Sequence, residues 1–305
     1  MRKGIVILLI VAAALTLLGG IIFTIGIITM NSQNITFSHG QYQETTYSGI
    51  EEIKSITVSG GTDDIKILPY DKDGYLVKCF EQTKVYNSVS VKDGVLCIER
   101  QDARKWYDCI SLFSKPTRVT VYIPEGIYDS LKINTNTGNV FVEQNFTFDN
   151  VDISCSTGDI QFLASTQHTL KLSVSTGNVT LGDGSKTFNQ GDVSIKVSTG
   201  KTEIKGTTCT SFTSTGDTGD IFMSNLVSTG DMNITRSTGD VKFHKCDAVN
   251  ITVRTDTGNV TGTLLSPKIF LHNTSTGKVS LPETTTGGKC KITTDTGNIK
   301  ISISQ

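Results

Sequence analysis

Residues 170–181 read Leu-Lys-Leu-Ser-Val-Ser-Thr-Gly-Asn-Val-Thr-Leu, and this stretch contains the pattern that decides the fold. Apolar and polar residues alternate on both sides of the Thr-Gly-Asn step. Alternation with a period of two is the pattern of a half-buried β-strand. The glycine predicts a tight turn between two strands, because glycine adopts positive φ values at no steric cost. The same alternation precedes Gly200 at 193–197 and Gly258 at 249–253.

The phrase Ser/Thr-Thr-Gly-Asp/Asn recurs at steps of 20, 19, 23, 19, 20, 19, 19 and 20 residues. A period near 20 is typical of a solenoid, in which one repeat cannot bury its own face and stacked repeats share a core. Three-strand rungs and paired hairpins both fit this length, and we favour an all-β, β-helix-like solenoid. The turn glycines are Gly138, Gly158, Gly177, Gly200, Gly219, Gly239, Gly258, Gly277 and Gly297.

The part before the repeats, about 51–125, is also rich in strand patterns but is less regular. Asp93-Gly94 lies between two alternating segments and predicts a two-residue hairpin turn. Pro124 is expected to end a strand or to lie at a sheet edge, since proline cannot donate to a β-ladder. Cys79 and Cys97 fall in segments that we expect to be neighbouring strands, where a disulfide is geometrically allowed.

The N-terminus carries an uncharged, mostly apolar run over residues 5–30, directly after Arg2 and Lys3. At about 1.5 Å per residue this run reaches roughly 39 Å, which exceeds the bilayer hydrocarbon thickness of about 30 Å. It predicts one transmembrane helix, an uncleaved anchor rather than a signal peptide. The positive-inside bias places residues 1–4 in the cytoplasm, with 31–50 as a linker and 51–305 as the extracellular domain of a single-pass cell-membrane protein. The expected membrane-facing anchors are Ile5, Leu9, Leu17, Ile22 and Ile27.

The composition argues against several classes of function. A formal net charge of -1 gives no positive field for nucleic acid. The 4 histidines are scattered and no Cys-x-x-Cys occurs among the 7 cysteines, so we expect no metal centre and no cofactor.

Aspartates after the repeat glycines offer a candidate acidic row: Asp159, Asp217, Asp231 and Asp240. Polysaccharide-cleaving enzymes use paired carboxylates, and some β-rolls bind calcium through aspartate repeats of a shorter period. Turn chemistry explains the row more simply, because Asp and Asn bond local backbone amides. An enzyme on a β-helix is therefore the third hypothesis, after the two non-enzymatic ones given below.

Two features suggest contacts with partners. The segment 104–113 interrupts the strand pattern and contains Trp106, Tyr107 and Phe113. It is expected either to cover an end of the solenoid or to contact a partner. The chain also stops within the repeat pattern at 299–305, so we expect this edge to be blunted by Lys300 or to pair with a second chain as a homo-oligomer.

The early strands, the Val-x-Val-x-Ile-Pro-x-Gly passage at 119–126 and the Thr-Gly-Asp/Asn rungs together resemble the bacterial putative-adhesin domain family with β-strand repeats, whose function is unknown. The resemblance covers about 51–305 and implies a membrane-anchored β-solenoid at the cell surface, with no catalytic residues. The leading hypothesis is a non-enzymatic scaffold for adhesion to a surface or envelope protein or to a glycan. The alternative is a regulatory component that senses envelope stress through a membrane partner.

Overall fold

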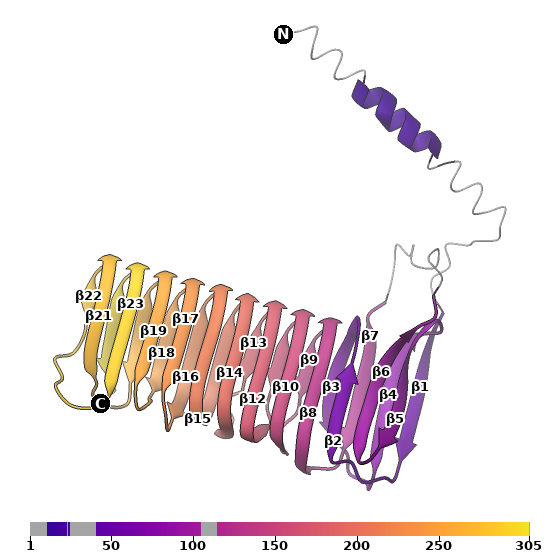
Figure 1. Ribbon diagram of the computed structural model, residues 1–305, viewed down its shortest axis with the longest axis horizontal. Helices are drawn as coiled ribbons and strands as arrows, with labels where there is room; N and C mark the ends of the chain where they lie inside the picture. The colour runs from indigo at the N-terminus through magenta and orange to yellow at the C-terminus, as the bar shows by residue number, and fades with distance from the viewer. Residues whose placement is uncertain (1–10, 23, 25–40, 105–114, 305) are drawn as a thin grey trace. The chain divides into compact units, whose positions relative to one another are not determined.

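A computed structural model describes residues 11–22, 24, 41–104 and 115–304. The chain divides into two compact units, and the strands lie in the unit made of Tyr42–Ala103 and Lys115–Gln305. Residues 11–22 form a helix in the other unit (Figure 1). Leu17 and Ile22 lie on this helix and are exposed, whereas Ile5, Leu9 and Ile27 lie outside the described residues. Among the described residues, no helix combines the length and the apolar character that crossing a membrane requires.

The chain begins its β-structure with a module of seven strands. They are β1 (Tyr42–Gly49), β2 (Ser55–Ser59), β3 (Asp63–Pro69), β4 (Tyr75–Gln82), β5 (Val85–Lys92), β6 (Val95–Asp102) and β7 (Thr117–Ile123). β4 pairs antiparallel with β1 and β7, whereas β2 and β3 pair parallel with β8 and β9 of the repeats. The module therefore joins an antiparallel sheet to the first rung of the solenoid.

The repeats form a parallel β-solenoid of about nine turns. Its first strands are β8 (Gly126–Thr137), β9 (Val140–Val142), β10 (Phe146–Thr157), β11 (Ile160–Phe162), β12 (Ser165–Thr176), β13 (Val179–Leu181), β14 (Phe188–Thr199) and β15 (Thr202–Thr218). The later strands are β16 (Ile221–Ser228), β17 (Met232–Thr238), β18 (Val241–Cys246), β19 (Ile251–Thr257), β20 (Val260–Leu264), β21 (Ile269–Thr276), β22 (Val279–Ser280), β23 (Lys289–Thr296) and β24 (Ile299–Ile303).

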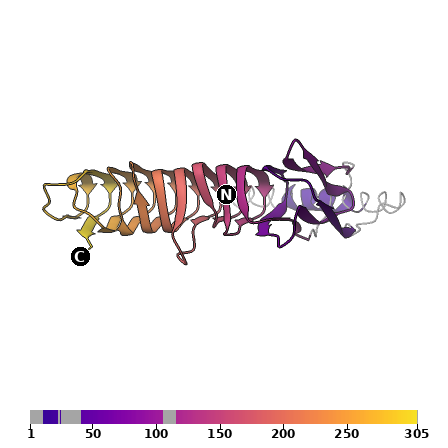
Figure 2. The same cartoon turned by 90° about the horizontal axis from the view of Figure 1, so that it is seen from below.

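A typical rung has one long strand and one short strand, joined by the Thr-Gly-Asp/Asn turn. β10, for example, pairs parallel with β8 and β12, and β11 pairs parallel with β9 and β13. The rungs follow one another along a single axis (Figures 1 and 2). The prediction of a solenoid is confirmed, and the parallel register rules out paired hairpins as the repeat unit.

The core is a set of columns, because equivalent residues of successive rungs stack inside the solenoid. The position seven residues before the turn glycine is buried from Leu131 through Leu170 and Phe212 to Cys290, except in the rung of Gly277, where Phe270 is half-buried. The 23-residue step between Gly177 and Gly200 is longer than the others. The extra residues lie between Leu181 and Phe188, where the chain leaves the stack through Gly182 and Gly184 at φ values of 72° and 82°.

Several expectations for the N-terminal module are confirmed and two are wrong. Asp93 and Gly94 have φ values of 52° and 77° and connect the antiparallel strands β5 and β6. β7 ends directly before Pro124. The strands, however, begin at Tyr42 rather than after a linker that ends at residue 50. Cys79 and Cys97 are both free thiols, because β4 pairs with β1 and β7 whereas β6 pairs with β2 and β5, so the two strands are not neighbours.

The last two rungs lie in the reverse of their sequence order. β23 pairs with β19 on one side and with β21 on the other, and β24 pairs with β20 and β22 in the same way. β21 and β22 therefore form the outermost rung, with Leu271 at 49% exposure and Val279 at 37% (Figure 1). The expectation that the C-terminal strand is the free edge is wrong, because the chain returns and inserts that strand between two earlier rungs.

Candidate functional site: the outer face beside the turn corner

The turn glycines are required by close stacking of the rungs as well as by their φ values. A Cβ on Gly200 would overlap the carbonyl oxygen of Gly177, and a Cβ on Gly219 would overlap that of Gly200. Seven of the nine predicted glycines have φ between 125° and 156°, but Gly258 and Gly277 do not have a positive φ in this range. A Cβ at Gly258 would still overlap the carbonyl oxygen of Gly239. Steric exclusion by the neighbouring rung is thus the requirement that all nine share.

The residue after each glycine forms a ladder of hydrogen bonds along the corner. The backbone N–H of Asn139 donates to Asp64 Oδ1 at 2.7 Å, and that of Asp159 donates to Asn139 Oδ1 at 3.0 Å. The backbone N–H of Asn178 continues the ladder to Asp159 Oδ1 at 2.7 Å. Each side-chain oxygen thereby satisfies a backbone donor one rung away, which explains the preference for Asp and Asn at this position.

Lysine occupies the ladder position at two places, one at the end of the ladder and one within it. Lys278 lies in the outermost rung, where its N–H donates to Asn298 Oδ1 at 2.8 Å and no further rung follows. Lys201 lies inside the stack, where its N–H donates to Asn178 Oδ1 at 2.9 Å. A lysine side chain has no acceptor, so Lys201 cannot bond the N–H of Asp220. The ladder then resumes from Asp220 to Asp240.

The predicted row of four aspartates does not form one row. Asp159 and Asp240 lie on the ladder, whereas Asp217 is outside it and Asp231 accepts from Asn250 Nδ2 at another position of the rung. Burial opposes ionisation of Asp240, but bonds from Asn259 and the proximity of Lys242 outweigh it and lower the pKa of this carboxyl group. Asp159 and Asp240 are engaged in architecture, but they accept from backbone amides of the next rung rather than from the local amides that turn chemistry predicts.

Beside the ladder runs a row of outward-facing side chains, one from each short strand. Strand register aligns Phe141, Gln161, Thr180, Glu203, Phe222 and Lys242 in this order. A depression of about 620 Å³ lies over part of this row and the adjacent ladder. It extends from Asp159 to Lys242. The ladder residues in its lining, which we call its rim, are Asp159, Asn178, Lys201 and Asp220. This volume is in the range of small-molecule sites, about 300–1,000 Å³.

Beneath the depression the core contains a buried arginine that the sequence analysis missed. Arg236 is 2% exposed, and its Nη2 donates at 3.0 Å to Thr202 Oγ1 and at 3.0 Å to Ser214 Oγ. Its Nε and Nη1 are buried without a hydrogen-bond partner in the described part of the chain. Burial lowers the pKa of the Arg236 guanidinium to about 10, and the charge of Asp217 opposes this shift.

The residues around Arg236 break the pattern of their columns. Thr202 occupies a column that otherwise contains Val or Ile, and Ser214 lies between Ile195 and Ile234. The guanidinium packs over Gly216, where a Cβ would overlap its Nη1. These deviations are visible in the sequence once the register is known, and a second glycine, Gly216, three residues before the turn glycine Gly219, marks the place.

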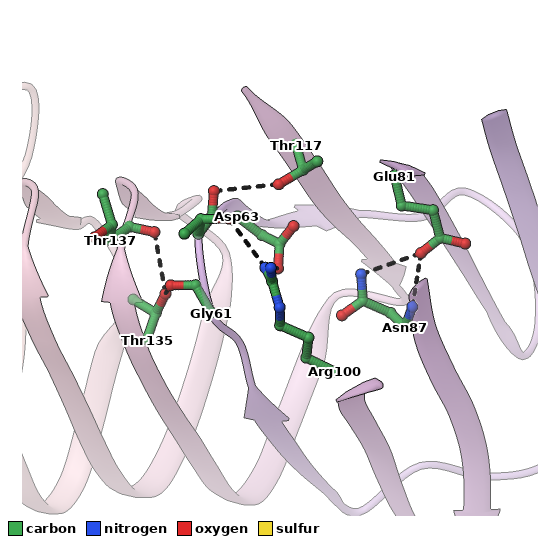
Figure 3. A network of polar contacts seen from close by, with 9 residues as sticks. Gly61, Asp63, Glu81, Asn87, Arg100, Thr117, Thr135 and Thr137 are labelled. Carbon is green, nitrogen blue, oxygen red and sulfur yellow. Dashed lines mark hydrogen bonds and ion pairs between the residues drawn. The ribbon is translucent and has the colours of Figure 1, made fainter. Parts of the chain in front are cut away.

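A second buried polar cluster lies in the N-terminal module (Figure 3). Glu81 accepts from the backbone N–H of Asn87 at 2.7 Å and from Thr45 Oγ1 at 2.9 Å. Arg100 Nη1 lies 3.5 Å from Asp63 Oδ2. Figure 3 shows Asn87 oriented toward Glu81 and Arg100 oriented toward Asp63. These contacts join β4 to β5 and β1, and join β3 to β6.

Chemically reactive groups are scarce among the described residues. Burial raises the pKa of the Cys79 thiol to about 12, with Glu81 and Asp63 adding to the effect, and burial raises the pKa of Cys290 to about 12 and of Cys209 and Cys246 to about 11. No group of three or more His, Cys, Asp or Glu residues is placed to hold a metal ion in the part that the structure describes. Trp106, Tyr107 and Phe113 lie outside the described residues.

Residues 53–302 match the family model of Toastrack DUF4097. The chain belongs to this family. No curated protein matches the chain. The match covers the N-terminal module and the solenoid together, as the resemblance noted in the sequence implied.

Solved structures with the same fold come from Parabacteroides distasonis ATCC 8503. One, described as a putative adhesin, has a TM-score of 0.53 and 16% identity over 86% of this chain and 98% of its own. Another, described as a putative lipid binding protein, has a TM-score of 0.53 and 15% identity over 86% of this chain and 98% of its own. At identities of 16% and 15%, the similarity of these two structures to the present chain concerns the fold alone.

Proposed function

We propose that this Toastrack protein is a non-enzymatic scaffold for adhesion, held at a cell membrane by its N-terminal apolar segment. The observation that supports the proposal most strongly is the outward row. It gives the short-strand sheet one accessible side chain per rung, from Phe141 to Lys242. A long, rigid face of repeated residues suits contact with an extended partner. The ladder carboxylates are engaged in hydrogen bonds between rungs, and burial raises the pKa of the buried thiols. Neither set of groups is suited to act as a catalytic acid, base or nucleophile.

The adhesion test compares bacterial cells that express the full chain with cells that express only residues 1–50. We expect the full chain to increase retention on epithelial monolayers or on cells of the same strain under flow. Equal retention of both cell types would contradict the proposal. If an envelope-stress reporter then responded to the deletion, the regulatory alternative would replace it.

Location is tested separately by adding a protease to intact cells. If the protein is a surface scaffold, the protease should cleave the domain at 51–305 while the cells remain intact. Full protection, with cleavage only after lysis, would contradict exposure at the surface and the predicted single-pass topology.

A further inference from the structure

The depression lies beside Lys201, where the hydrogen-bond ladder of the corner is interrupted. The neighbouring ladder residues bond the next rung through their side-chain oxygens, as Asn178 does to the N–H of Lys201 at 2.9 Å. Lys201 forgoes that bond, and within the described part of the chain its ammonium group takes part in no ion pair. An asparagine at this position would complete the ladder. The lysine at 201 therefore has no architectural explanation, unlike Lys278 at the end of the stack.

The floor of the depression is unusual at the same rung. Thr202 lines the depression, although its column is otherwise Val or Ile, and it accepts a hydrogen bond from Arg236 Nη2 at 3.0 Å. A buried arginine with two unpartnered nitrogens costs stability. The polar floor and the interrupted rim thus coincide at one rung, and neither is favoured by the packing of the solenoid.

The charges around the depression balance. Its lining includes the acids Asp159, Glu203 and Asp220 and the bases Lys201 and Lys242, with Arg236 directly beneath. Glu203 pairs with Lys205 at 3.0 Å, and Lys242 pairs with Asp240 at 3.4 Å. The lining thus has three acids and two bases, and the buried Arg236 guanidinium supplies a third positive charge, so the site selects neither an anionic nor a cationic polymer by net charge.

The remaining lining suits a ligand rich in hydroxyl groups. Lys201 donates, carboxylates accept, and the side chains of Gln161, Asn178 and Thr180 can do both. A sugar hydroxyl also donates and accepts, so it can bond to any of these groups. Phe222, at 37% exposure, adds an apolar platform for the C–H face of a sugar ring. Extended along the row, the site can contact successive sugars from successive rungs, which lie about 4.8 Å apart.

We infer that the depression lined by Gln161, Asn178, Lys201, Glu203 and Phe222 binds a neutral, linear oligosaccharide. This inference rests on the proposed function, because it names the ligand class of the same outer face. The ligand lies across the short strands, with Phe222 under one sugar ring and Lys201 bonding to its hydroxyl groups.

The test uses the purified full-length protein on an array of neutral linear hexasaccharides built from glucose, galactose, mannose or N-acetylglucosamine, with oligogalacturonate as an anionic comparison. We expect at least one neutral hexasaccharide to bind. Phe222→Ala should weaken that binding about tenfold or more, since an aromatic anchor contributes most at a small site. The matched control is Tyr86→Ala, which removes an aromatic side chain of similar exposure, 40%, from β5 of the N-terminal module, outside the row, and should leave affinity unchanged.

Lys201→Asn should weaken binding about threefold without lowering the melting temperature, which separates a binding role from a structural one. Binding of no neutral hexasaccharide, preference for oligogalacturonate, or equal effects of Phe222→Ala and Tyr86→Ala would each overturn the inference. Cells that still adhere despite such a result would leave the adhesion scaffold standing and point to a protein partner. Glycan binding without adhesion would instead remove the proposed function alone.

Discussion

The rung of β10 and β11 and the rung of β15 have equivalent places in the stack but differ in what their side chains do. In the first, the inward positions are Val151, Ile153 and Cys155, and Asp159 serves the ladder. In the second, the inward positions are Phe212, Ser214 and Gly216, with Thr202 in the adjacent column. The first is explained by packing and hydrogen bonding alone. The second gives up apolar contacts to hold one arginine, and departures of this kind are expected at functional or strained sites.

The feature that both rungs share should give the largest effect. Gly200→Ala places a Cβ against the carbonyl oxygen of Gly177 at a φ of 143°, so the neighbouring rung must move. We expect a loss of about 3 kcal/mol or more in the free energy of unfolding, measured by denaturant titration followed by circular dichroism. Gly126→Ala is the matched control, because no atom lies within 4 Å of its added Cβ.

Gly258 separates the two possible reasons for glycine at the corner. Its φ is not in the left-handed region, but its added Cβ would overlap the carbonyl oxygen of Gly239. If stacking decides, Gly258→Ala should cost nearly as much as Gly200→Ala. A loss below about 1 kcal/mol, typical of a compatible backbone, would show that φ is the requirement.

The irregular rung should show strong coupling between the residues that deviate. Ser214→Ile restores the aliphatic column but removes an acceptor and crowds the Arg236 guanidinium. Arg236→Thr matches Thr255 in the next rung but leaves a cavity. We expect each single change to be destabilising and the double variant to recover about 2 kcal/mol relative to their sum. Additive effects in this double-mutant cycle would refute the view that the two residues form one unit.

Acid should affect the ladder more than the rest of the corner. The folded-state pKa of Asp240 is lowered below its ordinary value of 3.8. Its ionised form therefore stabilises the fold above the unfolded pKa, and this contribution is lost as pH falls through the lower, folded pKa. Asp240→Asn keeps an oxygen for the N–H of Asn259. It should reduce the loss of unfolding free energy between neutral and strongly acidic pH by less than about 1 kcal/mol, because the group is partly solvated.

The control for this charge removal is Asp256→Asn, which breaks a surface pair with Arg254 at 3.6 Å. It should change the loss of unfolding free energy in acid less than Asp240→Asn does. Chemical denaturation at a series of pH values from neutral to strongly acidic measures both. Identical pH profiles for the wild type and Asp240→Asn would contradict the role assigned to the ladder carboxylate.

The repeats were predictable because their cause is local. The alternation around Gly177 and the spacing of the glycines follow from strand geometry and from the short distance between rungs. The reversed order of β21 and β23 was not predictable, because both carry the same Thr-Gly turn and each fits either place in the stack. Arg236 was missed for a related reason. Its partners Thr202 and Ser214 lie 34 and 22 residues away, so the pocket is visible only after the register is known.

The smallest expected effect is the sharpest test of why the two rungs differ. Lys201→Asn supplies an oxygen for the N–H of Asp220 and completes the ladder between Asn178 and Asp240. One added hydrogen bond should stabilise the fold by about 0.5–1 kcal/mol. Lys278→Asn is the matched control, because the ladder ends there and nothing is gained. Raised stability with weaker glycan binding would show that Lys201 trades stability for function, whereas lower stability would mean that the lysine contributes to the corner through its own packing.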